Sequence, residues 1–354
     1  MALSKIGTDG ISADTAINGF TPTASNMAGR NRIINGDMRI DQRNAGAAIS
    51  TSSGALGYPV DRWYMQNNVG TFSSQQVADA PPGFVNSLKV TVSSSGTPGS
   101  TDYARLAQRI EGFNVADLNY GSANAKSISV SFWVKSSVTG TYGFTVNTAY
   151  ATTVVYVTEY TISAANTWTK VTATIPPETI AAINTNNELG LLLGFDMGEG
   201  SSRSQAAGVW TVIVAGTYGL TGGTKLVTNA SATWQITGVQ LEEGSVATPF
   251  EYRMYGQELA LCQRYYNYAT NMWMSGQSYG TNGSVDGFVQ VFRFPTEMRA
   301  NPTITFSGGS DGGSSASLYS GGVSTSHVNI NLRSQAANTY VWYAGFKTTA
   351  EAEL

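Results

Sequence analysis

The sequence predicts an all-β protein, and three observations lead to this prediction. Charged residues make up only 12% of the chain, about half of the share of roughly 25% that is usual in globular domains. Gly, Ser, Thr and Asn take their place, a mixture typical of short strands joined by tight turns. Several short segments alternate apolar and polar residues, which is the pattern of a strand with one face on a core.

Composition also narrows the function classes. The net charge is −3 without a Lys/Arg-rich run, which argues against nucleic-acid binding. No apolar run is long enough to span a bilayer, so we expect no membrane insertion, and the start lacks an apolar signal core, so we expect folding in a cytoplasm. The single cysteine, Cys262, and the single histidine, His327, exclude a disulfide framework and an ordinary zinc site. We predict a chain without a cofactor or a metal ligand.

Residues 1–30 are predicted to form an extended N-terminal arm. They carry few charges and no long periodic apolar run. Because such a sequence cannot bury enough surface to order itself, we expect the arm to contact another subunit or another protein.

Residues 31–252 are predicted to form one β-sandwich. The alternation is clearest in the segments Leu88–Val92, Ile128–Val134 and Trp168–Ile175. In Trp234–Leu241 the apolar phase shifts at Gly238, which indicates a β-bulge. We expect a further strand over Ile33–Arg39, in the same domain as Trp234–Leu241.

A short helix over residues 253–266 is predicted to link this domain to a second β domain, residues 267–354. Apolar residues recur there at spacings of three or four, which gives a helix one apolar face: Tyr252, Tyr255, Leu259, Cys262 and Tyr266. In the second domain, Phe288–Phe294 reads as a strand, and Thr339–Phe346 and Thr349–Leu354 read as closing strands.

Two separated segments resemble the two ends of one known domain. The first is Asn31-Arg-Ile-Ile-Asn-Gly-Asp-Met-Arg-Ile-Asp-Gln-Arg43 with Tyr58-Pro-Val-Asp-Arg-Trp63, and the second runs from Trp234 through Glu251 into Glu258–Tyr266. Together they resemble phage tail-fibre and minor tail proteins that carry a jelly-roll domain similar to a carbohydrate-binding module. Phe294–Phe306 resembles the C-terminal modules of such fibres.

The resemblance implies a virion tail protein, made in the host cytoplasm, that mediates adsorption to the host surface by binding a glycan or a protein. It implies a homotrimer with a jelly-roll middle domain and a C-terminal β tip, whose arm, residues 1–30, is held by another virion tail protein. Two alternatives stay open. One is a structural virion component, such as a tail adaptor or a capsid decoration, and the other is a tailspike that depolymerises polysaccharide.

The acidic motifs have both a functional and a structural interpretation. Glycoside hydrolysis needs two carboxylates about 5–9.5 Å apart across a cleft. Asp196 and Glu199 are a local pair, but on a turn we expect them to be solvated, and we predict no catalytic residue. Asp37 and Glu242-Glu243 lie near opposite ends of the domain sequence, and their carboxylates are ligands of the kind that Ca²⁺ takes. A structural calcium ion bound by them stays an open alternative.

The motif Asp61-Arg62-Trp63 also has two interpretations. A Trp face, a carboxylate and a guanidinium together suit a sugar. We favour the structural interpretation, in which Trp63 is a core residue and the Asp-Arg pair holds the start of a strand.

Receptor recognition is predicted to lie in the C-terminal domain, because attachment through the arm places that domain outward. The segments 274–286 and 307–323 are rich in Gly, Ser and Asn and read as loops with uncharged donors and acceptors. The residues that we expect to bind the receptor are Trp273, Tyr279 and Tyr319, whose rings offer stacking faces. The alternative is that the aromatic residues of this domain fill a trimer core. In Tyr340–Tyr343, alternation places Tyr340 and Trp342 on one face.

Overall fold

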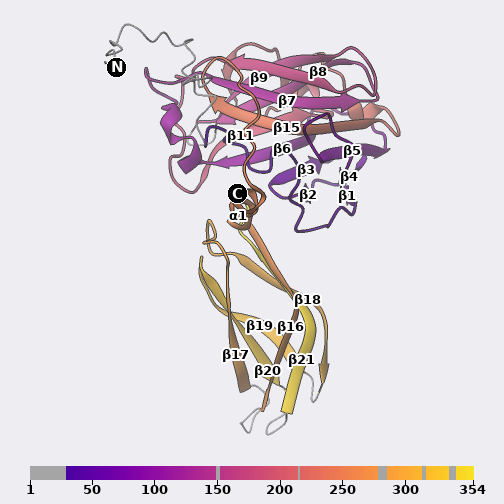
Figure 1. The fold of residues 1–354 in the computed structure, drawn as a ribbon. Coiled ribbons are helices and arrows are strands. Elements are labelled where there is room, and N and C mark those ends of the chain that lie inside the picture. Colours follow the sequence, from indigo (N-terminus) through magenta and orange to yellow (C-terminus); the bar gives the residue numbers. More distant parts are fainter. Residues whose placement is uncertain (1–28, 149–151, 214–215, 278–284, 313–315, 335–339) are drawn as a thin grey trace, which may run out of the picture.

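The computed structural model describes residues 29–148, 152–213, 216–277, 285–312, 316–334 and 340–354. Its regular structure is almost entirely β, as the sequence predicts, and the linking helix α1 (Tyr255–Gln263) lies between two β-sandwiches (Figure 1). The helix is shorter than predicted, because Tyr266 already belongs to the next strand. The predicted arm, residues 1–30, lies outside the described residues except for its last two. Within the described ranges, no helix is long and apolar enough to cross a membrane.

The N-terminal sandwich, here called the jelly roll, consists of two sheets whose strands pair antiparallel. The first sheet has six strands, in the order β1 (Ile49–Thr51), β4 (Thr71–Val77), β5 (Ser87–Ser94), β15 (Thr233–Glu243), β7 (Ile128–Ser136) and β10 (Thr169–Ile175). The second has seven, in the order β13 (Trp210–Val212), β9 (Val154–Ile162), β8 (Gly140–Thr148), β11 (Leu189–Asp196), β6 (Ala104–Glu111), β3 (Trp63–Asn67) and β2 (Leu56–Val60). A short parallel pair and several 3₁₀ turns complete the domain: β12 (Ser204–Gln205) with β14 (Gly219–Leu220), and Gly112–Asn114, Ala116–Leu118, Ser201–Arg203 and Leu226–Thr228.

The core of the jelly roll lies between the two sheets, and β5 shows the alternation of a strand that buries one face. The side chains of Leu88, Val90 and Val92 in β5 are buried, whereas Lys89 and Thr91 between them are partly exposed. Aromatic rings from both sheets meet at the centre: Trp63, Phe132, Phe144, Phe195 and Trp234. The bulge predicted at Gly238 is confirmed, since the pairing of β15 with β7 shifts register there and Gly238 has a φ of 62°.

The predicted strand over Ile33–Arg39 is wrong. Asn35 and Met38 have φ angles of 57° and 59°, so the chain turns instead of extending. The side chain of Asn35 causes part of this turn, because its amide donates to Ile40 O at 2.8 Å and its oxygen accepts from Ile40 N at 2.9 Å. The segment still lies against β15, where Arg32 N donates to Leu241 O at 2.8 Å.

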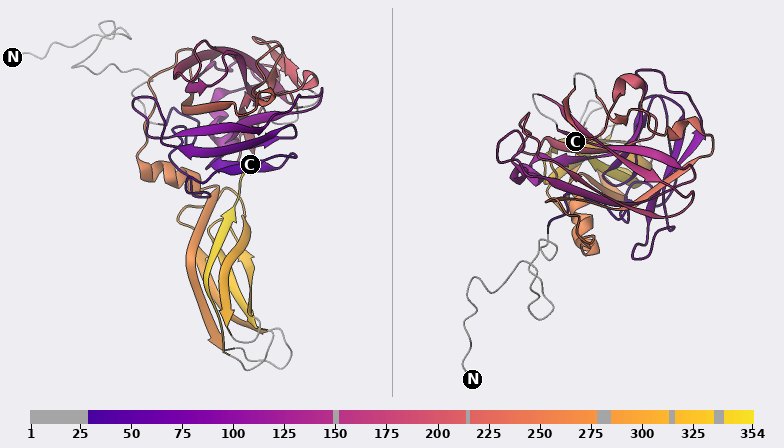
Figure 2. Two further views of the ribbon diagram at one scale, coloured as in Figure 1. Left: turned by 90° about the vertical axis from the view of Figure 1, so that its right-hand side faces the viewer. Right: turned by 90° about the horizontal axis from the view of Figure 1, so that it is seen from above.

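The C-terminal sandwich is smaller and has two three-stranded sheets. One contains β16 (Tyr266–Gln277), β21 (Tyr340–Glu351) and β18 (Thr303–Gly312), and the other contains β17 (Val285–Arg293), β20 (His327–Ser334) and β19 (Ala316–Val323). The strands run along the long axis of this domain (Figure 2, left). The two closing segments predicted from the sequence form a single strand, β21. The buried core includes Met274, Phe294, Met298, Ile330 and Phe346.

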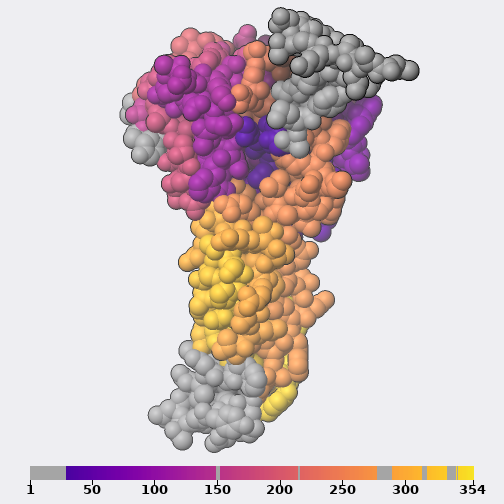
Figure 3. All heavy atoms as spheres, turned by 60° about the vertical axis from the view of Figure 1, so that its left-hand side comes forward, coloured from indigo at the N-terminus to yellow at the C-terminus, as the bar shows by residue number. Residues whose placement is uncertain are grey.

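The two sandwiches meet at a polar joint, from which the narrower C-terminal domain projects (Figure 3). The buried guanidinium of Arg62, from the jelly roll, pairs with Glu353 of the C-terminal domain. It also donates to Arg109 O at 2.6 Å and lies 3.4 Å from the ring centroid of Tyr265. The C-terminal residue Leu354 therefore lies at the joint and not at the far end of the domain (Figure 1).

Further ion pairs and hydrogen bonds hold the joint. Glu111 accepts from Arg264 at 2.5 Å and from the Tyr265 hydroxyl at 2.7 Å. Arg299 of the C-terminal domain and Asn187 of the jelly roll exchange hydrogen bonds of 2.9 Å through their side chains and carbonyl groups. These contacts fix the orientation of the C-terminal domain.

Replacing Arg62 is expected to destabilise the full chain. The side chains of Arg62 and Glu353 are only 2% and 7% exposed, so Arg62→Met leaves a buried carboxylate with Arg43 as its remaining partner. We expect the free energy of unfolding to fall by about 3 kcal/mol, as measured by urea denaturation. The control Lys126→Met breaks the exposed pair with Glu243, and about 0–1 kcal/mol should be lost. Equal losses in the two variants would contradict this account of the joint.

Candidate functional site

The outer surface of sheet β16-β21-β18 carries a row of aromatic rings. Because side chains alternate along β21, Tyr343 packs on the core while Trp342 lies on the outside. The neighbouring strand continues the pattern, since Met274 is buried and Trp273 is outside. We call the outward rings the aromatic face: Tyr268, Trp273, Tyr340 and Trp342.

These rings are large and exposed although they belong to paired strands. Trp273 and Tyr340 are 58% and 59% exposed, and Tyr268 is 40% exposed. Trp342 is half-buried because its ring lies close above Gly312, where an added Cβ would come within 2.1 Å of it. At about 3.3 Å per residue, the face extends for roughly 30 Å along β21.

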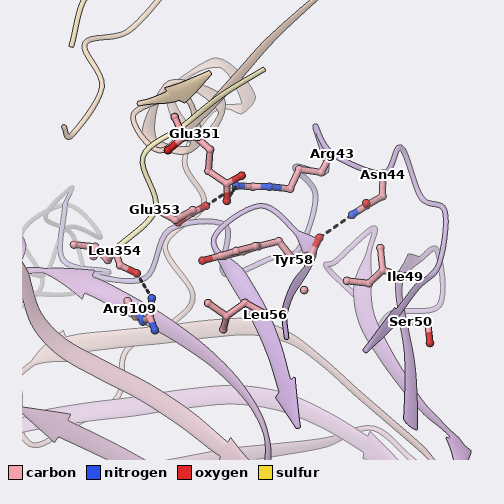
Figure 4. Close-up of a pocket in the computed structure, with 12 residues that line it drawn as sticks. Arg43, Asn44, Ile49, Ser50, Leu56, Tyr58, Arg109, Glu351, Glu353 and Leu354 are labelled. Atoms are coloured by element: carbon pink, nitrogen blue, oxygen red, sulfur yellow. Dashed lines mark hydrogen bonds and ion pairs between the residues drawn. The ribbon is translucent and has the colours of Figure 1, made fainter. Parts of the chain in front are cut away.

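The aromatic face ends at a pocket in the joint, here called the joint pocket. Glu351 pairs in register with Tyr266 on one side and Thr303 on the other, so these three residues continue the outer surface of the sheet. Glu351 and Thr303 also line the joint pocket, a cavity of about 660 Å³ (Figure 4). That volume lies within the range of about 300–1,000 Å³ that is typical of ligand sites.

The joint pocket has an apolar wall and, beside it, basic and acidic side chains whose charges offset each other. The guanidinium of Arg43 lies between the rings of Tyr58 and Tyr266, 4.5 and 3.9 Å from their centroids, and pairs with Glu353 at 3.0 Å. Arg109 donates to Leu354 O (Figure 4). The opposite wall is formed by Ile49 and Leu56. This arrangement suits an uncharged ligand with both apolar and hydroxyl-bearing faces.

The predicted receptor-binding residues do not form one cluster. Trp273 belongs to the aromatic face, whereas Tyr319 lies on β19 of the opposite sheet, in register with Asn331. Tyr279 lies outside the described residues. The structure therefore places Trp273 and Tyr319 on different sides of the domain.

The segments predicted as recognition loops are mostly strands. Residues 274–277 belong to β16, and residues 307–323 belong to β18 and β19 apart from the part that is not described. Backbone pairing with β20 and β21 outweighs the weak strand propensity of their glycines.

The motif Asp61-Arg62-Trp63 takes the structural role that we favoured. Trp63 is fully buried and its indole donates to Asn35 O at 3.0 Å. Asp61 accepts from Gln42 N at 3.1 Å, and Arg62 holds the joint.

The acids considered for calcium have protein partners instead. Asp37 pairs with Arg39 at 2.9 Å, and Glu242 accepts from the Thr248 hydroxyl at 2.7 Å. In the part of the chain that the structure describes, no group of three or more His, Cys, Asp or Glu residues could hold a metal ion.

The prediction that Asp196 and Glu199 are solvated is wrong, because both are 1% exposed. Asp196 is saturated: its oxygens accept from Gly198 N and Glu199 N at 2.8 Å and from Leu220 N and Lys225 Nζ at 3.0 Å. Glu199 differs, since neither of its carboxylate oxygens has a hydrogen-bond partner among the described residues. The nearest cationic group is Arg105, 3.7 Å away. Burial raises the pKa of Glu199 to about 8, although Arg105 opposes the shift.

Comparison with known proteins finds no matching family model and no matching curated protein. Among solved structures, the enzymatically active domain of tailspike protein 4 from bacteriophage CBA120 is similar, with a TM-score of 0.34 and 13% sequence identity. The match covers 60% of this chain and 21% of the tailspike chain. The CBM22-1 xylan-binding domain of Paenibacillus barcinonensis Xyn10C gives a TM-score of 0.25 with 14% identity, covering 58% of this chain and 99% of the other. TmCBM61 in complex with beta-1,4-galactotriose gives a TM-score of 0.31 with 11% sequence identity, and the match covers 61% of this chain and 99% of the other. These values are too low to establish a shared fold or function.

Glu199 is expected to make the stability of the jelly roll depend on pH. Its ordinary pKa is 4.5 and its pKa in the folded protein is about 8, so between these values the folded protein binds more protons than the unfolded chain. The free energy of unfolding should therefore fall as pH rises through this window, by at most roughly 1.4 kcal/mol per pH unit. Glu199→Gln should remove this fall, as measured by urea denaturation at pH 5, 7 and 9. With the control Glu188→Gln, which changes an exposed acid, the slope should stay that of the unmodified protein. Parallel curves for all three proteins would contradict the assignment.

Proposed function

We propose that this chain is a receptor-binding subunit of a bacteriophage tail fibre that adsorbs the virion to its host by binding surface glycan. The glycan lies along the aromatic face, and its end enters the joint pocket. The mechanism is binding and not catalysis.

The observation that carries this proposal is the exposure of two large rings on one sheet, Trp273 within β16 and Tyr340 at the start of β21. Large exposed aromatic groups in a contiguous row mark an interaction surface. Flat rings stack on the apolar faces of sugar rings, while Ser275, in register with Trp342, supplies an uncharged hydrogen-bonding group. A row about 30 Å long fits an extended polysaccharide better than a compact ligand.

The sequence resemblance to tail-fibre proteins supports the same function and adds a trimer. Each contact with a sugar residue is weak, and three copies of the face on one fibre, repeated over the virion, multiply these contacts by avidity. Lys347 Nζ lies 4.9 Å from the ring centroid of Tyr268, and the carboxylate of Glu351, in register with Tyr266, brings the opposite charge to the same surface. Since these two charges offset each other, the face suits neutral glycan.

A second copy of the chain is the competing occupant of the aromatic face, with the rings in a trimer contact. The oligomeric state of the ring variants separates this from glycan binding. Release of new reducing ends from host polysaccharide would instead indicate a depolymerase, and a protein without affinity for host cells would indicate a structural component.

Removal of the aromatic rings is expected to weaken adsorption. Trp273→Ala and Trp342→Ala should each weaken binding of the purified full chain to host cells by about 1–3 kcal/mol, the scale of an interface hot spot. The matched control is Val289→Ala, which changes a 56% exposed side chain of β17 on the opposite sheet. Tyr319→Ala tests whether the opposite sheet takes part.

Three results would contradict this proposal. Unchanged binding by both Trp variants would place the receptor site elsewhere, and loss of binding by Tyr319→Ala alone would place it on the opposite sheet. Dissociation of the oligomer in both Trp variants would show that the rings fill a subunit contact.

Deletion of residues 1–28 is expected to leave a folded protein that no longer joins the virion. The deletion keeps Gly29 and Arg30, whose contacts with Glu251 and Pro249 hold the start of the described chain on the jelly roll. Thermal unfolding of the truncated protein should match that of the full chain, while purified virions should lack it. Normal incorporation of the truncated protein would exclude attachment through the arm.

A further inference from the structure

A second pocket lies beside the linking helix, at the same end of the aromatic face as the joint pocket. It has a volume of about 380 Å³, and we call it the helix pocket. Its walls come from the jelly roll, from α1 and from the start of β16: Ile40, Asp41, Gln42, Tyr255, Leu259, Gln263, Tyr268 and Thr270. None of these residues lines the joint pocket.

The helix pocket adjoins both the aromatic face and the joint pocket. Tyr268 belongs to the aromatic face and also lines the helix pocket. Its ring centroid is 6.4 Å from that of Tyr266, which in turn lies 3.9 Å from the guanidinium of Arg43 in the joint pocket. Gln42 lines the helix pocket, whereas the next residue, Arg43, lines the joint pocket. The row of rings therefore leads to two neighbouring pockets.

The walls of the helix pocket are fixed by contacts outside it. The carboxylate of Asp41 accepts from Gly46 N at 2.7 Å, and Gln42 Nε2 donates to Tyr266 O at 3.2 Å. Leu259 packs on a small buried apolar cluster. Because these walls are already ordered, a ligand does not have to order them when it binds.

Several uncharged polar groups of the helix pocket remain free for a ligand. Among the described residues, the side chains of Tyr255, Gln263 and Thr270 form no hydrogen bond. The rings of Tyr255 and Tyr268 are 57% and 40% exposed. Such amide and hydroxyl groups bond to the hydroxyls of a sugar, and the rings cover its apolar face. The carboxylate of Asp41 disfavours an anionic ligand.

The presence of two pockets at one end of the aromatic face bears on the shape of the ligand. An unbranched chain that lies along the aromatic face can end in only one of the two pockets. The helix pocket is near the lower end of the range of about 300–1,000 Å³ that is typical of ligand sites, so it suits a short group.

We propose that the receptor glycan is branched, with its main chain ending in the joint pocket and a short uncharged side branch in the helix pocket. The branch leaves the main chain at the sugar residue beside Tyr268, the residue that the aromatic face and the helix pocket share. This inference rests on the proposed function and specifies the class of glycan that the aromatic face binds.

The test compares the surface polysaccharide of the host before and after exoglycosidases have removed its side branches, with methylation analysis to count the branch points. Isothermal titration calorimetry measures binding of each form to the purified full chain. The unmodified chain should bind the intact form about tenfold more tightly, the scale of one or two additional hydrogen bonds.

Two variants change the helix pocket. Thr270→Trp places a large ring on an exposed lining residue and should close the pocket, so that both forms bind equally, with the affinity that the unmodified chain has for the trimmed form. Gln263→Ala removes one free amide and should reduce the preference for the intact form.

The controls separate the helix pocket from the aromatic face. Thr172→Trp makes the same change at an exposed strand residue of the jelly roll and should keep the preference for the intact form. Trp273→Ala should weaken binding of both forms by the same factor, because its ring contacts the main chain. Thermal unfolding checks that each variant is folded.

The outcomes distinguish this inference from the proposed function. Equal binding of both forms by the unmodified chain, an unchanged preference in Thr270→Trp, or a bound polysaccharide without branch points would overturn the inference alone. An equal loss for both forms in Thr270→Trp would do the same, since the helix pocket would then hold the main chain. No binding of either form, or full binding by Trp273→Ala, would overturn the proposed function and the inference with it.

Discussion

The ion pair between Arg62 and Glu353 is the interaction on which the arrangement of the two domains depends. It joins residues 291 positions apart, and both side chains are shielded from water. Burial of two charges is tolerated only when their geometry satisfies both, so the pair allows little variation in the angle between the domains. The joint pocket exists because of this fixed angle, since its walls come from both domains. The aromatic face is continuous with the joint pocket for the same reason.

Much of the fold could be predicted from the sequence where local patterns act alone. Alternation located β5, β7 and β10, and the shift of phase at Gly238 located the bulge. Ile33–Arg39 failed as a strand because the side chain of Asn35 bonds to the backbone of its own turn, which the apolar pattern does not reveal. The segments of β16, β18 and β19 that are rich in Gly and Ser read as loops because propensity carries no information about which strand lies beside them. Their structure depends on pairing with β20 and β21.

For the candidate sites too, local patterns in the sequence were predictive, and contacts between distant residues were not. Alternation correctly placed Tyr340 and Trp342 on one surface, and Trp273 joins them only through the register of β16 with β21. The burial of Asp196 and Glu199 could not be predicted, because the residues that cover them come from the distant segment 219–225. Arg62 looked like the start of a strand in the sequence. Its partner, Glu353, lies in a C-terminal segment with no motif of its own. Non-local pairs of this kind leave no signal in a single sequence.

Both ends of the C-terminal domain's chain lie at the joint, and this determines how the domain carries a mechanical load. Strand β16 continues covalently from helix α1, whereas the end of β21 is held by Arg62 and Arg43 through Glu353. A pull on this domain directed away from the joint reaches the jelly roll by two routes, through the peptide chain at α1 and through the ion pairs of Glu353. Because both strands are attached at the same end of the domain, this pull shears the ladder between β16 and β21 only after the ion pairs of Glu353 have opened. Within the described residues, the domain thus has a covalent and an ionic attachment to the jelly roll, and the ladder between β16 and β21 joins the two.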